Sequence, residues 1–448
     1  MSEIISLFTV FSPHLSTTTL RQFCRVVFAV LAMTGSVTMR NISRWTKKGG
    51  SYRTIQRFYN TLIPWGTLCW VFFRAHLYDP DDVYLLAGDE TVLPKSGDET
   101  YGLSRFFSST LGKTIRGLAF FAVSLIRVKQ RRSYPMLMEQ VVRGEASTPP
   151  KEVSAVSKTS ETKGKPGRPK GSKNRNKTEV VLNDTLKQVQ SMLKMVLATL
   201  GGTLKIGYFL LDGYFGNNNT LQMVRACGLH LISKLRRDAA LYLPPTTPYQ
   251  GRGRPAIYGE KFNPKEIDST YKVSTQTQGN ITTEVYQIEC RHKRFPDPLN
   301  VVCLLKTDTK TQEKSHVLLF SSDLDLDAET MIDYYSLRFQ IEFNFRDAKQ
   351  FWGLDDFMNV KETPVNNAAN LSMFMVNVSA KLREMFGTPE HPGFGVLDIK
   401  ARYRGLKYLQ ETLKILPQKP EAIVIDNIAE HLASIGAIHY TSNQIRPG

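Results

Sequence analysis

Two aspartates in the sequence follow apolar runs that have the length of buried strands. Asp89 follows residues 83–88, and Asp212 follows residues 204–211. A carboxylate at the end of a strand lies at the edge of the sheet, where open α/β sheets place their chemistry. Its oxygens are hard ligands that suit Mg²⁺ or Mn²⁺, and no cluster of His or Cys residues offers a competing site. Asp followed by Gly, Tyr or Asn at the end of a strand is also common in turns, however, so each aspartate taken singly is more typical of a turn than of a ligand.

A third carboxylate, Glu342, lies in a segment that we expect to form one helix over residues 328–351. At about 100° per residue, Tyr335, Arg338, Glu342 and Lys349 would project from one narrow stripe of that helix. A solvated charged face could have the same spacing. The apolar residues between these four indicate a packed helix instead, and a charged stripe on a packed helix indicates a functional site.

These residues carry a resemblance to a known family. Tyr335, Arg338, Glu342 and Lys349, at these gaps, resemble the Tyr-Arg-Glu-Lys signature of bacterial insertion-sequence transposases of the group designated family four. AGDET around Asp89 and LLDGYFGN around Asp212 look like the two aspartate motifs of the same DDE superfamily. The resemblance implies an α/β fold with a ribonuclease-H-like catalytic core, in which helices flank a mixed five-stranded sheet. It also implies an inserted antiparallel β region between the second aspartate and the glutamate.

The resemblance also implies a mechanism. Asp89, Asp212 and Glu342 would be the catalytic residues and would hold two Mg²⁺ ions, for which Mn²⁺ can substitute, with Asp89 bridging both. Tyr335 and Arg338 would bind a DNA phosphate, and Lys349 would position the transposon-end strand. A structural role, in which the cations only neutralise the neighbouring carboxylates, stays open. Cleavage through a DNA hairpin with a flipped base is implied by the resemblance alone.

The charge of the chain favours a polyanionic partner. The 448 residues include 58 Lys and Arg against 41 Asp and Glu, a net charge of +17. Cations that neutralise phosphates release condensed counterions, so we expect double-stranded DNA as the partner, both transposon ends and target. An anionic membrane surface is the alternative from charge alone. The resemblance implies a homodimer in the synaptic complex, with each subunit acting on one DNA end.

Periodicity and composition divide the chain into five predicted segments. We expect a helical N-terminal DNA-binding domain whose second helical stretch carries Arg53 and Arg57, although a helical subdomain with a solvated basic face fits the same pattern. Alternating β-branched residues predict the β-rich insertion. The predicted segments are residues 1–80 (DNA-binding), 81–235 (first part of the catalytic core), 236–320 (β insertion), 321–390 (second part of the core) and 391–448 (helical C-terminal region).

Two basic elements contain Gly-Arg-Pro. The first lies in residues 165–177, within a basic insert at 145–178 that we expect to be flexible, and it includes Arg168 and Lys170. The second includes Arg252 and Arg254. An extended Arg-Pro element can lie in a narrow minor groove, where the negative potential attracts arginine. A solvated linker fits both elements as well, so DNA contact is one of two interpretations of each element.

Cysteine usage and hydropathy indicate the compartment. The five cysteines are widely scattered, which argues against a disulfide framework, and no apolar run approaches the roughly 20 residues of a membrane span. We therefore expect no membrane partner and a bacterial cytoplasmic, nucleoid-associated location. The function expected is transposition, by cleavage and strand transfer at terminal inverted repeats. The alternatives are a ribonuclease-H-like nuclease without strand transfer and a domesticated DNA-binding protein.

Overall fold

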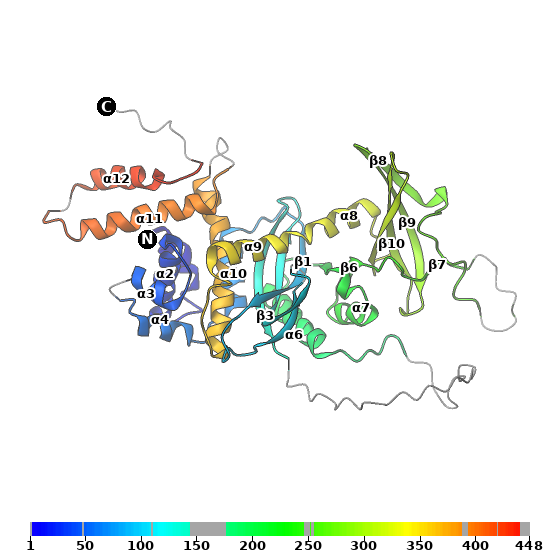
Figure 1. Ribbon diagram of the computed structural model, residues 1–448, viewed down its shortest axis with the longest axis horizontal. Helices are drawn as coiled ribbons and strands as arrows, with labels where there is room; N and C mark the ends of the chain where they lie inside the picture. Colours follow the sequence, from blue (N-terminus) through cyan, green and yellow to red (C-terminus); the bar gives the residue numbers. More distant parts are fainter. Residues whose placement is uncertain are drawn as a thin grey trace.

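A single large sheet and a group of helices make up an elongated molecule in the computed structural model (Figure 1). The structure describes residues 2–46, 49–108, 111–143, 176–245, 251, 255–387, 393–418 and 420–439. The sheet carries strands at one end of the long axis that project beyond the helices. The helices α11 (Val396–Leu413) and α12 (Ala422–Ser434) lie at the opposite end. No helix within these ranges is long and apolar enough to cross a membrane.

The central part of the sheet is mixed. In the order β4-β3-β1-β5-β6, β3 runs antiparallel to both β1 and β4, whereas β5 runs parallel to β1 and β6 runs parallel to β5. A further strand, β2, pairs with the first part of β3. The α/β class predicted from the sequence is thus confirmed. The bounds are β1 (Tyr84–Pro94), β2 (Ser104–Ser108), β3 (Lys113–Arg127), β4 (Arg132–Val141), β5 (Tyr208–Leu210) and β6 (His230–Lys234).

Antiparallel strands continue the sheet beyond β6. β11 pairs with β6, β10 with β11, and β9 with β10, while β7 and β8 both pair with β9. The antiparallel strands expected between residues 236 and 320 are therefore present, and they extend the central sheet instead of forming a separate one. Their bounds are β7 (Leu241–Tyr242), β8 (Lys272–Gln278), β9 (Ile281–His292), β10 (Leu299–Asp308) and β11 (Lys314–Ser321).

Helices pack against the central strands. α6 contacts β3 and β4, α7 contacts β6, and α8 contacts β6 and the outer strands. α9 contacts β1 and β4, and α10 contacts α9 and β4. α6 begins where Asn183 accepts a hydrogen bond from the Leu186 amide, and it ends at Gly201, whose φ of 57° favours glycine. The bounds are α6 (Asp184–Leu200), α7 (Asn218–Arg225), α8 (Ala328–Leu337), α9 (Gln340–Trp352) and α10 (Glu362–Phe386).

The N-terminal helices share one apolar core with the C-terminal half of the chain. The ring of Phe374 on α10 lies 5.3 Å from the rings of both Phe23 and Phe72, and 5.7 Å from that of Phe8. α2 also contacts α11 (Figure 1). The described residues up to 80 are mainly helical as expected, but whether they act as a separate DNA-binding domain stays a prediction. The bounds are α1 (Ser2–Phe8), α2 (Thr17–Ala32), α3 (Met39–Thr46), α4 (Tyr52–Tyr59) and α5 (Trp65–His76).

The side chains of strand β1 pack alternately into two apolar clusters. Leu86 belongs to the large core, whereas Leu85 and Ala87 belong to a smaller cluster that also contains Leu337 of α8. Because side chains alternate along a strand, Asp89 lies on the same face as Leu85 and Ala87. This face of β1 is therefore the one that can meet the junction between α8 and α9.

Candidate active site

Asp89 lies inside strand β1 and not at its end. The strand was expected to end at Gly88, but it continues to Pro94 because residues 89–94 keep their pairing with β3, where Asp89 lies opposite Ala122. The Asp89 carboxylate accepts a hydrogen bond of 2.9 Å from the Glu90 amide and its side chain is only 18% exposed. The residue therefore presents a largely buried carboxylate from the middle of the sheet.

Asp212 lies beside Asp89 on the neighbouring strand. β5 is parallel to β1 with Leu210 opposite Ala87, so Asp212 and Asp89 each lie two residues beyond this pair. Neighbouring strands are about 4.8 Å apart, which brings the two positions close together. Asp212 also begins the short 3-10 helix η2 (Gly213–Phe215), where its carboxylate accepts from the Tyr214 amide at 3.2 Å. Asp212 therefore forms a turn, which was one of the two roles predicted for it, and it also lies next to the carboxylate of Asp89.

Arg338 connects Asp89 to Glu342. Its guanidinium lies 3.3 Å from Asp89 Oδ2 through Nη1 and 3.0 Å from Glu342 Oε1 through Nη2. The guanidinium carbon lies 5.9 Å from the centre of the Tyr335 ring. Arg338 therefore brings together a strand residue and a helix residue that are far apart in the sequence.

The prediction of a single helix over residues 328–351 is wrong in one respect, because this segment forms two helices. α8 ends at Leu337 and α9 begins at Gln340. Across the junction, amides bond to carbonyls three residues back, as Ile341 does to Arg338 at 3.2 Å and Glu342 to Phe339 at 3.1 Å. This tighter winding changes the angle between successive side chains, so a stripe calculated for one regular helix does not hold across the joint.

Burial dominates the electrostatics of this site. It raises the pKa of Asp89 to about 6, against the opposing effect of the Arg338 guanidinium, and the charges of Asp212 and Glu342 raise it further. Burial also raises the pKa of Tyr335, again opposed by Arg338. Arg338 pairs with two of these carboxylates, Asp89 and Glu342, and the negative charge that remains around Asp89 favours a further cation.

The carboxylates suit a divalent cation by their chemistry, but they do not form a finished metal site. Hard oxygen ligands on two strands and a helix are what Mg²⁺ or Mn²⁺ prefers. Within the described ranges, however, no group of three or more His, Cys, Asp or Glu side chains is close enough together to hold a metal ion. Arg338 lies between Asp89 and Glu342, where its guanidinium provides the positive charge. A metal would need this side chain to move.

The remaining predicted site residues are placed differently. Lys349 lies in the last turn of α9, where its charge acts on Asp355, whose pKa is raised mainly by burial and lowered by Lys349. Arg53 and Arg57 are exposed one turn apart on α4. The basic insert at 145–178 lies outside the described residues up to 175, and so do four predicted DNA contacts: Arg168, Lys170, Arg252 and Arg254.

A buried amide that sequence reasoning missed holds α9 on the sheet. Asn344 is 4% exposed and its Nδ2 donates to Ser133 Oγ at 2.9 Å and to Ser124 Oγ at 3.4 Å. Ser124 lies opposite Ala87 of β1. Because Asn344 lies two residues after Glu342, this contact fixes the helix that carries the third carboxylate. The position of Asn344 among the apolar residues of α9, beside Phe345 and three residues after Ile341, was the only signal for it.

We expect the substitution Asn344→Leu to lower the free energy of unfolding by about 1–3 kcal/mol, because it leaves two buried hydroxyls without their donor. Urea denaturation of the metal-free protein measures this. The exposed Gln350→Ala on the same helix is the matched control. A difference between the two variants of less than about 0.5 kcal/mol, the range of ordinary surface substitutions, contradicts this role for Asn344.

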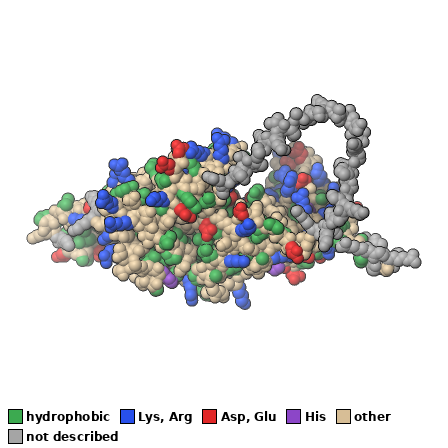
Figure 2. Space-filling model, turned by 90° about the horizontal axis from the view of Figure 1, so that it is seen from below, with side chains coloured by type: hydrophobic (Ala, Val, Ile, Leu, Met, Phe, Trp, Pro, Cys, Tyr) green, Lys and Arg blue, Asp and Glu red, His purple; other side chains and the backbone are tan. Residues whose placement is uncertain are grey.

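A basic cleft opens directly after Asp212. It has a volume of about 760 Å³ and is lined by residues 214–220, by the chain after β6 and by the turn after β9. Its cations are Arg236, Lys293 and Arg294, and its wall includes Tyr214, which is 79% exposed. Figure 2 shows basic side chains along the whole molecule, with one group of them on the half that carries the outer strands. The short basic runs 236–237 and 291–294 could have indicated this cleft in the sequence.

Comparison with known proteins gives one family. A family model described as DDE superfamily endonuclease matches residues 10–293, which is more than half of the chain. The matched range includes Asp89 and Asp212 and ends before Glu342. No curated protein matches the chain.

Proposed function

The chain belongs to the DDE superfamily of endonucleases, and we propose that it is a DNA transposase that cuts and joins DNA strands at the terminal inverted repeats of an insertion sequence. The contact that carries the proposal is the bridge from Arg338 to Asp89 and Glu342. It joins a carboxylate inside the matched range to one outside it. The spacing of Tyr335, Arg338, Glu342 and Lys349 supports the group with the Tyr-Arg-Glu-Lys signature. The mixed five-stranded centre of the sheet supports the ribonuclease-H-like core that this group implies.

Asp89, Asp212 and Glu342 would hold the divalent metal ions, with Mg²⁺ proposed and Mn²⁺ as a substitute. When bound, such ions lower the pKa of an attacking water or 3′-hydroxyl and stabilise the leaving oxygen at phosphorus. The protein contributes rigid positions: Asp89 is fixed in a paired strand, and Asp212 is fixed by the Tyr214 amide and by its own carbonyl, which accepts from Ser233. Fixed ligands keep the reacting groups aligned without reorganisation.

Arg338 would change partner when DNA arrives. A guanidinium presents paired N–H donors that match a phosphate as well as they match a carboxylate. Its side chain is 14% exposed and its Nε is buried without a hydrogen-bond partner among the described residues. The Tyr335 ring lies beside it, with its centre 5.9 Å from the guanidinium carbon. A DNA phosphate at this position would draw Arg338 away from Asp89, and Lys349 would contact the transposon-end strand further along α9.

The basic cleft after Asp212 supports a path for the DNA backbone. Arg236 is held by Asp238 at 3.1 Å, whereas the Arg294 guanidinium has no hydrogen-bond partner in the part of the chain that the structure describes. Burial and the charge of Arg294 lower the pKa of His292, so Arg236, Lys293 and Arg294 supply the positive charge of the cleft at pH 7. Arg53 and Arg57 on α4 are proposed to contact the duplex elsewhere.

We expect the double variant Arg236→Ala with Arg294→Ala to weaken DNA binding and to reduce its salt dependence. Each phosphate contact contributes about 0.9 to the slope of log K against log salt, so the slope should fall by about 2. Binding titrations from low to moderate salt measure it. Lys306→Ala with Lys310→Ala, two exposed cations at the β10–β11 end, is the control. An unchanged slope in the first variant places the DNA elsewhere.

Transposition itself is tested by incubating the full chain with its element's terminal repeats, a target plasmid and Mg²⁺. Ends that are cut and joined to the target support the proposal. Cutting without joining indicates a nuclease, and binding alone indicates a domesticated DNA-binding protein. The Asp212→Asn variant should neither cut nor join. The mass of the complex with two DNA ends tests the proposed homodimer, since a single subunit per pair of ends contradicts it.

A further inference from the structure

One cation lies in line with two carboxylates of the active site. Asp89 on β1 and Asp212 after β5 are level with each other. β6 continues this register, because Leu210 of β5 pairs with Ile232 of β6. Lys234 lies two residues beyond Ile232 and is therefore level with Asp212. Neighbouring strands are about 4.8 Å apart, so these three positions form one row across the sheet.

The side chain of Lys234 lies on the face of the sheet that carries the carboxylates. Ile232 belongs to the smaller apolar cluster, which also contains Ala87, whereas Leu231 belongs to the large core. Side chains alternate along a strand, so Lys234 shares the face of Ile232. Asp89 shares the face of Ala87 for the same reason. At this edge the apolar face of the sheet therefore gives way to two carboxylates and one ammonium group.

The turn after Asp212 packs against the backbone of Lys234. The hydroxyl of Ser233 donates to the Asp212 carbonyl at 2.8 Å. A Cβ added at Gly216 would clash with the Lys234 carbonyl oxygen, so a side chain there would prevent this close approach of the turn to β6. The backbone of Lys234 is thus held in place beside that of Asp212, while the side chain of Lys234 is exposed.

The Lys234 ammonium is a free cation. Its side chain makes no ion pair or hydrogen bond with any other residue that the structure describes. The neighbouring cations are engaged, since Arg338 pairs with two carboxylates and Arg236 pairs with Asp238. An ammonium group at the end of a flexible four-carbon stem can therefore meet an anion that arrives from outside.

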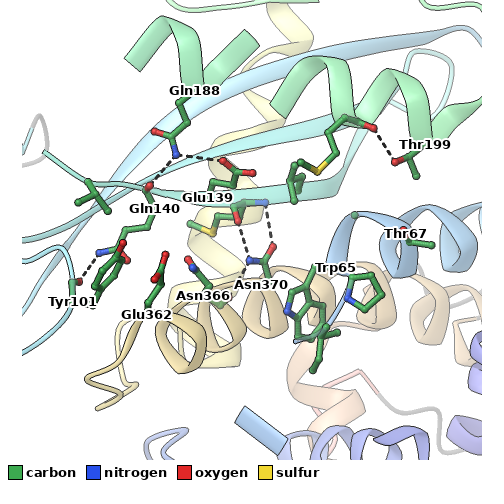
Figure 3. Close-up of a pocket in the computed structure, with 17 residues that line it drawn as sticks. Trp65, Thr67, Tyr101, Glu139, Gln140, Gln188, Thr199, Glu362, Asn366 and Asn370 are labelled. Carbon is green, nitrogen blue, oxygen red and sulfur yellow. Dashed lines mark hydrogen bonds between the residues drawn. The ribbon is translucent and has the colours of Figure 1, made fainter. Parts of the chain in front are cut away.

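A second cleft, between α5, α6, α10 and the end of β4, does not suit an anion. It has a volume of about 540 Å³. Figure 3 shows Glu139 and Gln140 of β4, Gln188 of α6 and Glu362 of α10 along its wall. Two of its described lining residues are acidic and none is Lys or Arg. Because like charges repel, the DNA backbone is expected on the side of Lys234 instead.

We propose, on the basis of the proposed function, that Lys234 binds the DNA phosphate next to the one that is cut, so that the cut strand runs across the ends of β1, β5 and β6. The phosphate being cut would lie at Asp89 and Asp212, one and two strands away. An ammonium group binds a phosphate as a point charge. Contacts to phosphates fix the register of a protein on DNA without reading its sequence. Lys234 thereby sets which bond of the strand reaches the carboxylates.

A different role of Lys234 has a different consequence. A cation one strand away from Asp212 also offsets negative charge in the free protein. If that were its only role, the loss of Lys234 would change the affinity of the free protein for Mn²⁺ and would leave the salt dependence of DNA binding as it was.

The first test is a binding titration of the full chain with a duplex that carries the inverted repeat flanking its gene, without divalent metal and over a range of salt concentrations. Lys234→Ala should lower the slope of log K against log salt by about 0.9, because one phosphate contact is lost. It should weaken binding by about fivefold or more, and Lys234→Arg should restore most of both. The control Lys205→Ala, which removes an exposed lysine before the opposite end of β5, should change neither.

The second test locates the phosphate. Uncharged methylphosphonate groups replace the phosphates of the cut strand one at a time. In the unchanged chain, the replacement next to the cut position should weaken binding by about fivefold or more. In Lys234→Ala the same replacement should change binding by less than about twofold, because the cation that it faced is already absent.

If Lys234→Ala keeps the slope of the unchanged chain, or if every neutral phosphate weakens both proteins equally, the proposal is wrong. A changed affinity for Mn²⁺ with an unchanged slope assigns Lys234 the role of offsetting the charge of Asp212. Failure of the unchanged chain to cut the duplex contradicts the proposed function instead, and the titrations without metal still test Lys234. Thermal unfolding shows that each variant is folded, and Lys234→Arg separates loss of charge from loss of structure.

Discussion

Asp89→Asn is expected to reduce DNA strand cleavage by about a thousandfold or more. Metal ions at a phosphoryl group contribute several kcal/mol of charge stabilisation, and each 1.36 kcal/mol corresponds to tenfold in rate. Asp89 lies on the strand next to Asp212 and pairs with Arg338, which in turn pairs with Glu342, so its position is the central one of the three carboxylates. Cleavage of a labelled terminal-repeat duplex under single-turnover conditions measures the loss.

The same substitution should leave the fold intact. An asparagine oxygen can still accept from the Glu90 amide, as Asp89 does at 2.9 Å. Burial raises the pKa of Asp89 to about 6, so at pH 7 the ionised carboxylate lowers the stability of the folded protein relative to the unfolded chain. The metal-free variant should therefore unfold at the same temperature or a higher one.

Asp333→Asn, an exposed carboxylate on α8 that pairs with Arg131, is the control for removing an acidic side chain near the site. It should cleave at nearly the normal rate. If Asp89→Asn retains cleavage within about tenfold of the unchanged chain, Asp89 does not hold a catalytic metal. A large fall in its unfolding temperature would instead assign Asp89 a structural role.

Sequence reasoning predicted the strands of the fold well where their residues were apolar. The runs before Asp89 and Asp212 correspond to β1 and β5, and the alternating segments after residue 236 correspond to β8–β11. These predictions succeed because buried strands need apolar or alternating residues whatever their neighbours are. What the pattern could not show is pairing: β11 joins β6 across about 80 residues of chain and so makes one sheet from two predicted regions.

The candidate site was predictable in its residue types but not in its geometry. The stripe of Tyr335, Arg338 and Glu342 assumed a regular helix, whereas the chain tightens at Arg338 and Phe339. The backbone of Arg338 and Phe339 keeps helical angles, which any residue can adopt. The sequence therefore has no Gly or Pro there from which the break between α8 and α9 could be predicted. The contact from Arg338 to Asp89 is a tertiary contact, which periodicity along one helix cannot predict. Likewise Asn344 is informative only once Ser124 and Ser133 are known to lie beneath it.

Arg338→Gln is the second substitution with a large expected effect, and it separates two roles of one side chain. With DNA bound, loss of the guanidinium removes a charge-assisted contact to phosphate, so cleavage should fall by about a hundredfold or more. Without DNA, the same change removes the cation that lies against Asp89 and Glu342 at 3.3 and 3.0 Å. Mn²⁺ should then bind the free protein more tightly than it binds the unchanged chain.

Opposite changes in cleavage and in metal affinity distinguish competition from simple damage to the site. A variant that had lost the arrangement of Asp89, Asp212 and Glu342 would lose both properties together, because the same oxygens serve each. Titration of Mn²⁺ followed by electron paramagnetic resonance measures affinity without any need for turnover. Arg346→Gln, which removes an exposed guanidinium that pairs with Asp347 on the same helix, should change neither.

If Arg338→Gln binds Mn²⁺ more weakly than the unchanged chain, Arg338 supports the carboxylates instead of competing for them, and the proposed exchange between carboxylates and phosphate is wrong. If its affinity rises, metal binding and DNA binding are coupled, since the phosphate that draws Arg338 away also frees the oxygens that the metal needs.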